Sequence, residues 1–304
     1  MDIKIIAEGL EFPEGPIAMP DGSVILVEIK RQTLTRVFPD GKTEIIAEMP
    51  GGPNGAALGP DGRVYVCNNG GFEWREVMGQ TISGDAPDDY RGGSIEAVDL
   101  RTGRVETLYT EVEGTALVGP NDIVFDRTGG FWFTDHGKTF GRTHAMGGLY
   151  YAKPDGSHII EAAFPIMSAN GVGLSPDEKT VYVADTFAAR LIAIDLVAPG
   201  EAAPSDIPLP GRPVATLQGY QFLDSLAVEE NGNICVATLL NGGITIVSPE
   251  GASEHVAFPD LFPTNICFAG ADRRDALVTL SGTGRLAKVR WPRAGLALNF
   301  TTYR

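Results

Sequence analysis

The chain has 304 residues, of which 43% are hydrophobic and 21% are charged, and its formal net charge at pH 7 is −15. This composition is typical of a globular protein with a substantial core and excludes disordered and fibrous classes. Nucleic-acid binding needs clustered lysine and arginine, so the acidic balance argues against a nucleic-acid surface and makes a cation the more natural partner.

The amino-terminal stretch, MDIKIIAEGLEF, contains acidic residues and no sustained apolar run with a small-residue cleavage site. It therefore does not read as a signal peptide, and no other run is long enough to span a bilayer. Cys67, Cys235 and Cys267 stand in strand-like apolar runs without CxxC spacing, which predicts reduced core thiols. We expect a cytoplasmic protein without membrane contacts.

Six segments along the chain repeat one pattern: a polar residue, an apolar strand, a turn containing Gly or Asp, and a second apolar strand. The segments are PEGPIAMPDGSVILVE, PNGAALGPDGRVYVCN, PNDIVFDRTGGFWFTD, ANGVGLSPDEKTVYVAD, LDSLAVEENGNICVAT and TNICFAGADRRDALVTL, and their polar residues are Glu14, Asn54, Asn121, Asn170, Asp224 and Asn265. Successive polar residues lie 40, 67, 49, 54 and 41 positions apart, close to the length of a four-stranded propeller blade. Further strand pairs between the segments, such as RQTLTRVFPDGKTEIIAE, complete about four strands per unit.

This repeat predicts an all-β fold, a six-bladed β-propeller with four-stranded antiparallel blades around a central metal-binding channel. A two-sheet sandwich also suits many short strands, but a fixed repeat of about fifty residues favours radial closure. We expect one domain over residues 1–304. The only long departure from the pattern is residues 72–93, a surface insertion that either borders the active-site mouth or is a plain exposed loop.

The repeated polar residue predicts a binding site on the axis. The first strand of each blade lines the channel, so equivalent residues from six blades converge there. All six carry a side-chain oxygen, although Asn and Asp are disfavoured in strands. Taken singly, each would more often cap a turn or hold a water molecule. Two carboxylates with several amide oxygens are typical of a calcium-type site and unlike the Cys and His ligands of structural zinc.

Other catalytic signatures are absent from the sequence: it contains no GxSxG, HExxH, Walker loop or GxGxxG. His136, in FTDHGK, follows the second strand of the third unit, where strand ends face the channel. It is either a substrate contact or a structural surface histidine.

At these residues the chain resembles the regucalcin/gluconolactonase family, also called the senescence marker protein family. The most specific pieces are FPEGP with Glu14, SANGVGLSPDEKTVYVAD with Asn170, and FLDSLAVEENGNICVAT with Asp224, and GPNDIVFDRTGGFWFTD adds Asn121. The resemblance covers nearly the whole chain. It implies metal ligands at these four positions and one divalent ion, calcium first, with zinc, manganese or iron as alternatives.

The resemblance also implies an enzyme, a lactonase of the gluconolactonase type, with a small lactone, most simply a sugar lactone, as substrate. We assign Asn54, Asn121, His136 and Asn265 to substrate binding. One departure concerns specificity: regucalcin-like members have Arg two residues before Asn121, and this chain has Gly119. We therefore expect a weaker grip on polyhydroxylated rings.

In the predicted mechanism the metal polarises the lactone carbonyl and Asp224 acts as general base on the attacking water. Two alternatives remain open. One is hydrolysis of organophosphates or other esters at the same site, and the other is a non-catalytic, calcium-binding propeller.

Overall fold

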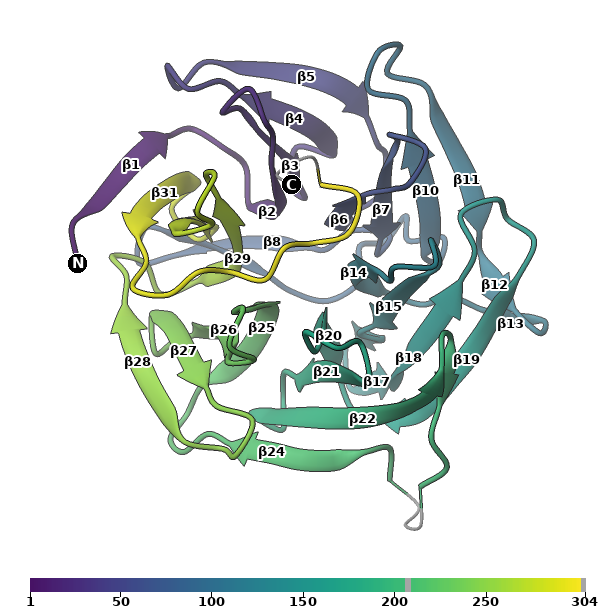
Figure 1. Cartoon of the computed structure of the whole chain (residues 1–304). Coiled ribbons are helices and arrows are strands. Elements are labelled where there is room, and N and C mark those ends of the chain that lie inside the picture. The colour runs from purple at the N-terminus through teal and green to yellow at the C-terminus, as the bar shows by residue number, and fades with distance from the viewer. Residues whose placement is uncertain (206–208, 302–304) are drawn as a thin grey trace.

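Six antiparallel sheets stand around a central axis in the computed structural model, which describes residues 1–205 and 209–301 (Figure 1). This confirms the predicted six-bladed propeller. Blades 1 to 3 are β2 (Pro13–Ala18), β3 (Val24–Glu28), β4 (Thr33–Val37) and β5 (Thr43–Glu48); β6 (Pro53–Leu58), β7 (Val64–Asn68), β10 (Ser94–Val98) and β11 (Val105–Tyr109); and β14 (Pro120–Phe125), β15 (Phe131–Asp135), β18 (Gly147–Ala152) and β19 (Ile159–Ile166).

The remaining blades follow the same order, from the axis outward. Blades 4 to 6 are β20 (Ala169–Leu174), β21 (Thr180–Asp185), β22 (Arg190–Ala198) with β23 (Glu201–Ala202) and β24 (Arg212–Thr216); β25 (Phe222–Val228), β26 (Ile234–Leu239), β27 (Gly243–Val247) and β28 (Ser253–Ala257); and β29 (Pro263–Ala269), β30 (Asp275–Leu280), β31 (Arg285–Arg290) and β1 (Ile3–Ala7). The last blade therefore joins both ends of the chain, because β1 pairs antiparallel with β31.

Within the described residues, three short two-stranded hairpins lie outside the blades. β8 (Trp74–Val77) and β9 (Gln80–Ser83) belong to the predicted insertion. β12 (Glu111–Val112) with β13 (Thr115–Ala116), and β16 (Lys138–Phe140) with β17 (Thr143–Ala145), are further departures from the repeat. The sequence pattern did not predict these two, because each lengthens a connection without breaking the strands on either side.

The core is divided between the blades. The described residues form six buried hydrophobic clusters, each made mainly by two neighbouring blades. The second strand of blade 1, β3, is buried along its whole length, whereas the outer strand β5 is largely exposed. The cysteines Cys67, Cys235 and Cys267 are buried free thiols, as predicted.

Every inner strand is irregular at its polar residue. The pairing of the inner strand with the second strand shifts register once per blade, between Glu14 and Ile17 in blade 1 and at the matching positions of the other five. Such a bulge bends the strand and changes the direction of a side chain. With regular pairing the same side chain would point into the neighbouring blade. Six bulges at one level therefore direct six polar side chains towards the axis.

Glycine permits the inner strands to approach one another at this level. A Cβ added to Gly15, which has φ +52°, would stand 2.7 Å from the carbonyl oxygen of Asn54 in blade 2. A Cβ on Gly171 would stand 2.7 Å from the carbonyl oxygen of Asp224 in blade 5. In blades 1, 2 and 4, a glycine after the polar residue thus lets the backbone of the next blade come into contact.

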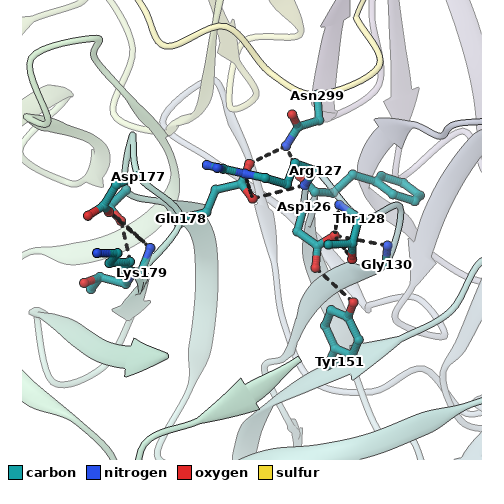
Figure 2. A network of polar contacts seen from close by, with 12 residues as sticks. Asp126, Arg127, Thr128, Gly130, Tyr151, Asp177, Glu178, Lys179 and Asn299 are labelled. Atoms are coloured by element: carbon teal, nitrogen blue, oxygen red, sulfur yellow. Dashed lines mark hydrogen bonds and ion pairs between the residues drawn. The ribbon is translucent and has the colours of Figure 1, made fainter. Parts of the chain in front are cut away.

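The two ends of the channel are covered by different segments. In Figure 1 the carboxy-terminal segment crosses the near end, while β8 passes behind the ring. On the near side, the Asn299 side-chain amide donates to Glu178 Oε1 at 2.7 Å, and Glu178 Oε2 pairs with Arg127 Nε at 2.9 Å (Figure 2). These contacts tie the segment to blades 3 and 4. No helix among the described residues has the length and apolar character needed to cross a membrane.

Candidate metal centre and active site

The six repeated polar residues lie together at the far end of the channel, where each inner strand begins. Five are almost fully buried, with exposures of 2% to 6%, and Asp224 is partly exposed. The predicted site residues that the structure brings into this ring are Glu14, Asn54, Asn121, Asn170, Asp224 and Asn265. His136 lies outside the ring, directly after β15 and at the same end of the channel, and we call the surface formed there by the connections of blades 3 to 5 the mouth.

Three buried oxygens of the ring have no hydrogen-bond partner among the described residues: Glu14 Oε1, Asn121 Oδ1 and Asn170 Oδ1. A buried polar atom left unpaired costs roughly 1–3 kcal/mol, so three at one level need a common explanation. A hard divalent cation accepts carboxylate and amide oxygens as ligands. The orphaned atoms therefore fit a metal ion, with Asp224 beside them.

The Asn265 side chain is hydrogen-bonded to Glu14. Its Nδ2 donates to Glu14 Oε2 at 2.7 Å, and its Oδ1 accepts from the backbone N–H of Ile266 at 2.7 Å. Both ends of this amide therefore have protein partners, and its contact is with a ligand candidate. Asn54 makes no side-chain hydrogen bond within the described part of the chain, so its amide stays free for a substrate or a water.

The carboxyl groups of the ring repel one another. Burial raises the pKa of Glu14 well above its usual value, and Asp224 raises it further, against the hydrogen bond from Asn265. Burial also raises the pKa of Asp224 to about 7, and Asn170 and the Ser225 backbone oppose this. A bound dication would relieve the repulsion and favour the ionised forms.

Asp122 is a third axial carboxylate, which the sequence analysis missed. It is 6% exposed, its Oδ2 accepts from the Val172 backbone N–H at 3.1 Å, and burial raises its pKa to about 7. Its charge raises the pKa of both Glu14 and Asp224. The signal was its place directly after Asn121, but regular strand alternation would have turned it away from the axis; the bulge keeps it there.

Metal binding at this site would require the amide oxygens as well as the carboxylates. Among the described residues, no three of the His, Cys, Asp and Glu side chains gather in a way that could hold a metal by themselves. The candidate ligands are two carboxylates, Glu14 and Asp224, and two amide oxygens, Asn121 and Asn170. This donor set suits an oxygen-seeking ion such as calcium better than zinc.

Aromatic side chains form a cluster at the mouth, on connections of blades 3 to 5. The His136 ring lies 5.9 Å from that of His144 and 5.5 Å from Phe187, and Phe187 lies 5.8 Å from Phe222. Phe187 is 45% exposed. Burial, then His144 and Lys138, lower the pKa of His136 to about 3, so its imidazole is neutral. The sequence analysis missed His144 and Phe187, which stand in different connections and share no motif.

The structure gives a steric reason for glycine at position 119. Its N–H donates to Asp135 Oδ1 at 2.7 Å, and an added Cβ would collide with the carbonyl oxygen of Gly137. Asp135 also accepts from the backbone N–H groups of Val118 and Gly137. An arginine at position 119 is therefore incompatible with this backbone, and Asp135 is occupied as a structural acceptor.

The axial cavity lies on the other side of the ring. It measures about 290 Å³ and is lined by inner-strand residues such as Ile17 and Leu226 and by Leu296 to Asn299 of the carboxy-terminal segment. Its lining includes Asp122 and Asn265, so the cavity extends to the level of the ring of polar residues.

Fold and site together define a six-bladed β-propeller with an oxygen-lined axial centre that fits a divalent metal. Residues 12–282 match the model of the SMP-30/gluconolactonase/LRE-like region. The chain belongs to this family.

Relatives agree with this assignment. The Lactonase drp35 of Staphylococcus saprophyticus is 30% identical over 254 residues, 82% of this chain and 70% of that protein. The solved structure of a gluconolactonase from Xanthomonas campestris has a TM-score of 0.75 at 20% identity and covers 95% of this chain and 89% of that chain. A calcium-binding regucalcin from Agrobacterium tumefaciens has a TM-score of 0.71 at 18% identity, with 99% and 96% covered. At these identities the two structures show the fold.

Proposed function

We propose that the protein is a metal-dependent hydrolase that opens a small lactone at the axial centre. The observation that carries the proposal is the set of three buried, unpartnered oxygens on Glu14, Asn121 and Asn170. Membership of the SMP-30/gluconolactonase/LRE-like family and the identity of 30% with a lactonase support the reaction class.

The residues of the ring have two proposed roles, metal binding and general-base catalysis. Glu14, Asn121, Asn170 and Asp224 would hold the ion, which when bound polarises the lactone carbonyl oxygen. Asp224 is the partly exposed carboxylate of the set, so it can reach a water that Glu14, fixed by Asn265, cannot. We assign it as general base: its Oδ takes a proton from the attacking water and returns it to the leaving alkoxide.

The mouth favours lactones with few hydroxyl groups. Recognition by arginine is sterically blocked at Gly119, and the exposed Phe187 together with the neutral His136 offers ring faces and one hydrogen-bonding imidazole. Such a surface binds apolar ring or chain substituents better than a polyhydroxylated sugar. We propose that sugar lactones are poor members of the substrate class.

A single experiment addresses metal and reaction together. The metal-free protein is titrated calorimetrically with calcium, zinc and manganese, and acid release from a lactone panel is followed with each ion. We expect saturable binding at one site and turnover only with metal. Glu14→Gln and Asn170→Ala should each weaken binding at least about tenfold, because each removes a charge or a ligand oxygen.

Asn231→Ala is the matched control for these variants, since Asn231 is exposed and supports only its own turn. Metal binding without turnover of any lactone or ester would make the protein a calcium-binding propeller. Turnover of organophosphates alone would assign the site to phosphoryl chemistry. Unchanged affinity in both ring variants would remove the metal from this ring.

A further inference from the structure

The connection between β7 and β10, residues 69–93, contains the predicted insertion and is called the insertion from here on. It crosses the end of the ring at which the candidate metal ligands lie. From its base at Asn69 it runs over blade 1, where the Trp74 ring packs 4.9 Å from Phe12. At its far point the backbone N–H of Thr81 donates to the carbonyl oxygen of Gly282, in blade 6, at 2.8 Å. Figure 1 shows β8 spanning this distance behind the ring.

The returning half of the insertion rests on blade 3. The Ala86 N–H donates to the Thr139 carbonyl oxygen at 2.9 Å, and the Tyr90 hydroxyl donates to the Val118 carbonyl oxygen at 2.6 Å. The insertion thus touches blades 6, 1, 2 and 3. Within the described ranges, none of its hydrogen bonds, ion pairs or ring contacts reaches blade 4 or 5.

Lys138 joins blade 3 to the base of this insertion. Its side chain is buried, its Nζ donates to the Gly71 carbonyl oxygen at 2.7 Å and to Asn69 Oδ1 at 3.2 Å, and it lies 3.8 Å from the centre of the Phe72 ring. A buried ammonium group is stable only with such partners, because burial lowers its pKa, here to about 7. All three partners belong to residues 69–72.

We propose that residues 69–93 form a fixed roof over blades 6, 1, 2 and 3, that Lys138 is the positioning residue that fastens this roof, and that substrate enters only over blades 4 and 5. The open side is the one that carries Phe187 and Phe222. A substituent on the substrate ring would lie between these rings and the roof edge. The substrate part of the proposal rests on the proposed lactonase function, whereas the roof itself does not.

The test compares Lys138→Met with the wild type in the metal-loaded protein. Methionine keeps the length and apolar stem but cannot donate to Gly71 or Asn69. We expect amide hydrogen exchange within residues 69–93 to accelerate about tenfold or more, because local opening becomes easier, with exchange in the blades unchanged. With γ-butyrolactone, kcat and KM should stay within about twofold, whereas with a hexyl-substituted γ-lactone KM should rise at least about fivefold.

Lys153→Met is the matched control, since Lys153 also contacts an aromatic ring in blade 3, that of Tyr151, but away from the mouth. Lys138→Arg, which retains a cation and donors, should restore most of the wild-type KM. If Lys138→Met fails to fold, Phe72→Leu gives the same comparison by removing the ring beneath the ammonium group.

The outcomes separate the two proposals. Unchanged exchange in residues 69–93 overturns the roof and its fastening, whatever the activity. Faster exchange with equal effects on both lactones overturns the one-sided entrance. If the wild type turns over no lactone, the proposed function fails, and exchange in the insertion still decides on Lys138.

Discussion

Three carboxyl groups at the level of the ring, Glu14, Asp122 and Asp224, interact electrostatically with one another. Folding raises the pKa of Asp122 and of Asp224 to about 7. A raised pKa means that the contribution of these groups to stability is complete below about pH 4 and is lost as the pH rises through about 7. The metal-free protein should therefore become less stable across this range on account of these residues.

Metal should reverse this trend. We predict that the difference in Tm between calcium-loaded and metal-free protein grows as pH rises from 5 to 8, because the ligands bind as carboxylates. Comparing loaded with free protein at each pH cancels groups with opposite shifts, such as His136. Scanning calorimetry at matched ionic strength measures the difference. A constant difference across this range would show that these carboxylates are not at the metal.

Asp224 should be separable from the other ligand candidates by its double role. Asp224→Asn keeps an oxygen of similar size but removes the basic site, so metal should still bind while kcat falls by about 10²–10⁴-fold. The measurement is single-substrate kinetics at saturating metal, with affinity determined separately. Retention of more than about a tenth of kcat would make Asp224 a ligand only. Asp135 is a weak substitute as base, because three backbone N–H groups occupy it.

At the scale of the strands, the bulge and the glycine beside it create the site. A Cβ on Gly171 would meet the backbone of Asp224 and of Leu226, both at 2.7 Å, and backbone cannot move aside. A Cβ on Gly173, two residues further along β20, meets the end of the flexible Leu226 side chain. Position 171 therefore cannot accept a Cβ without a backbone shift, whereas position 173 can accept one if the Leu226 side chain moves.

We predict that Gly171→Ala destabilises the protein by about 1–3 kcal/mol and weakens metal binding, because it pushes blade 5 away from blade 4. Gly173→Ala is the matched control and should cost clearly less. Urea unfolding and calcium titration of both variants check this. Equal losses of stability and equal affinities would show that the close approach at Gly171 does not set the ring geometry.

The six bulges also mark where prediction from the sequence ended. The repeat predicted the inner strands and which residue of each reaches the axis, because composition at those positions contradicts strand propensity. It did not predict Asp122, whose direction depends on the register shift in blade 3. Nor did it predict the aromatic cluster at the mouth. His144 and Phe187 stand in connections of two different blades and come into contact only in the folded propeller.

For the molecule as a whole, stability depends on closure of the ring by β1. Ile3 and Ile5 pack against the cluster between blades 5 and 6, and β1 pairs with β31 from Ile3 to Ala7. Removing residues 1–8 would uncover this apolar surface and leave β31 as an unpaired edge. With β1 in place blade 6 has four strands like the other blades, and β1 rather than β31 is its outer strand.

We predict that deletion of residues 1–8 lowers the free energy of unfolding by at least about 2 kcal/mol and promotes self-association, since two half-buried isoleucines and a strand pairing are lost. Lys4→Ala, an exposed change on the same strand, is the control and should behave as wild type. Chemical denaturation and light scattering measure both effects. A monomeric deletion variant of unchanged stability would show that blade 6 is complete with three strands.

Because blade 6 pairs β1 with β31, these two neighbouring strands leave the ribosome far apart in time. β1 emerges first, yet its partner begins at Arg285. At about 5–20 residues per second, the wait is roughly 15–60 s. Blades 1 to 5 can pair their strands as they appear, since each is contiguous in the chain. During synthesis, then, Ile3 and Ile5 lack their native packing partners until blade 6 is complete, and β1 would be a binding site for a nascent-chain chaperone that holds short apolar strands.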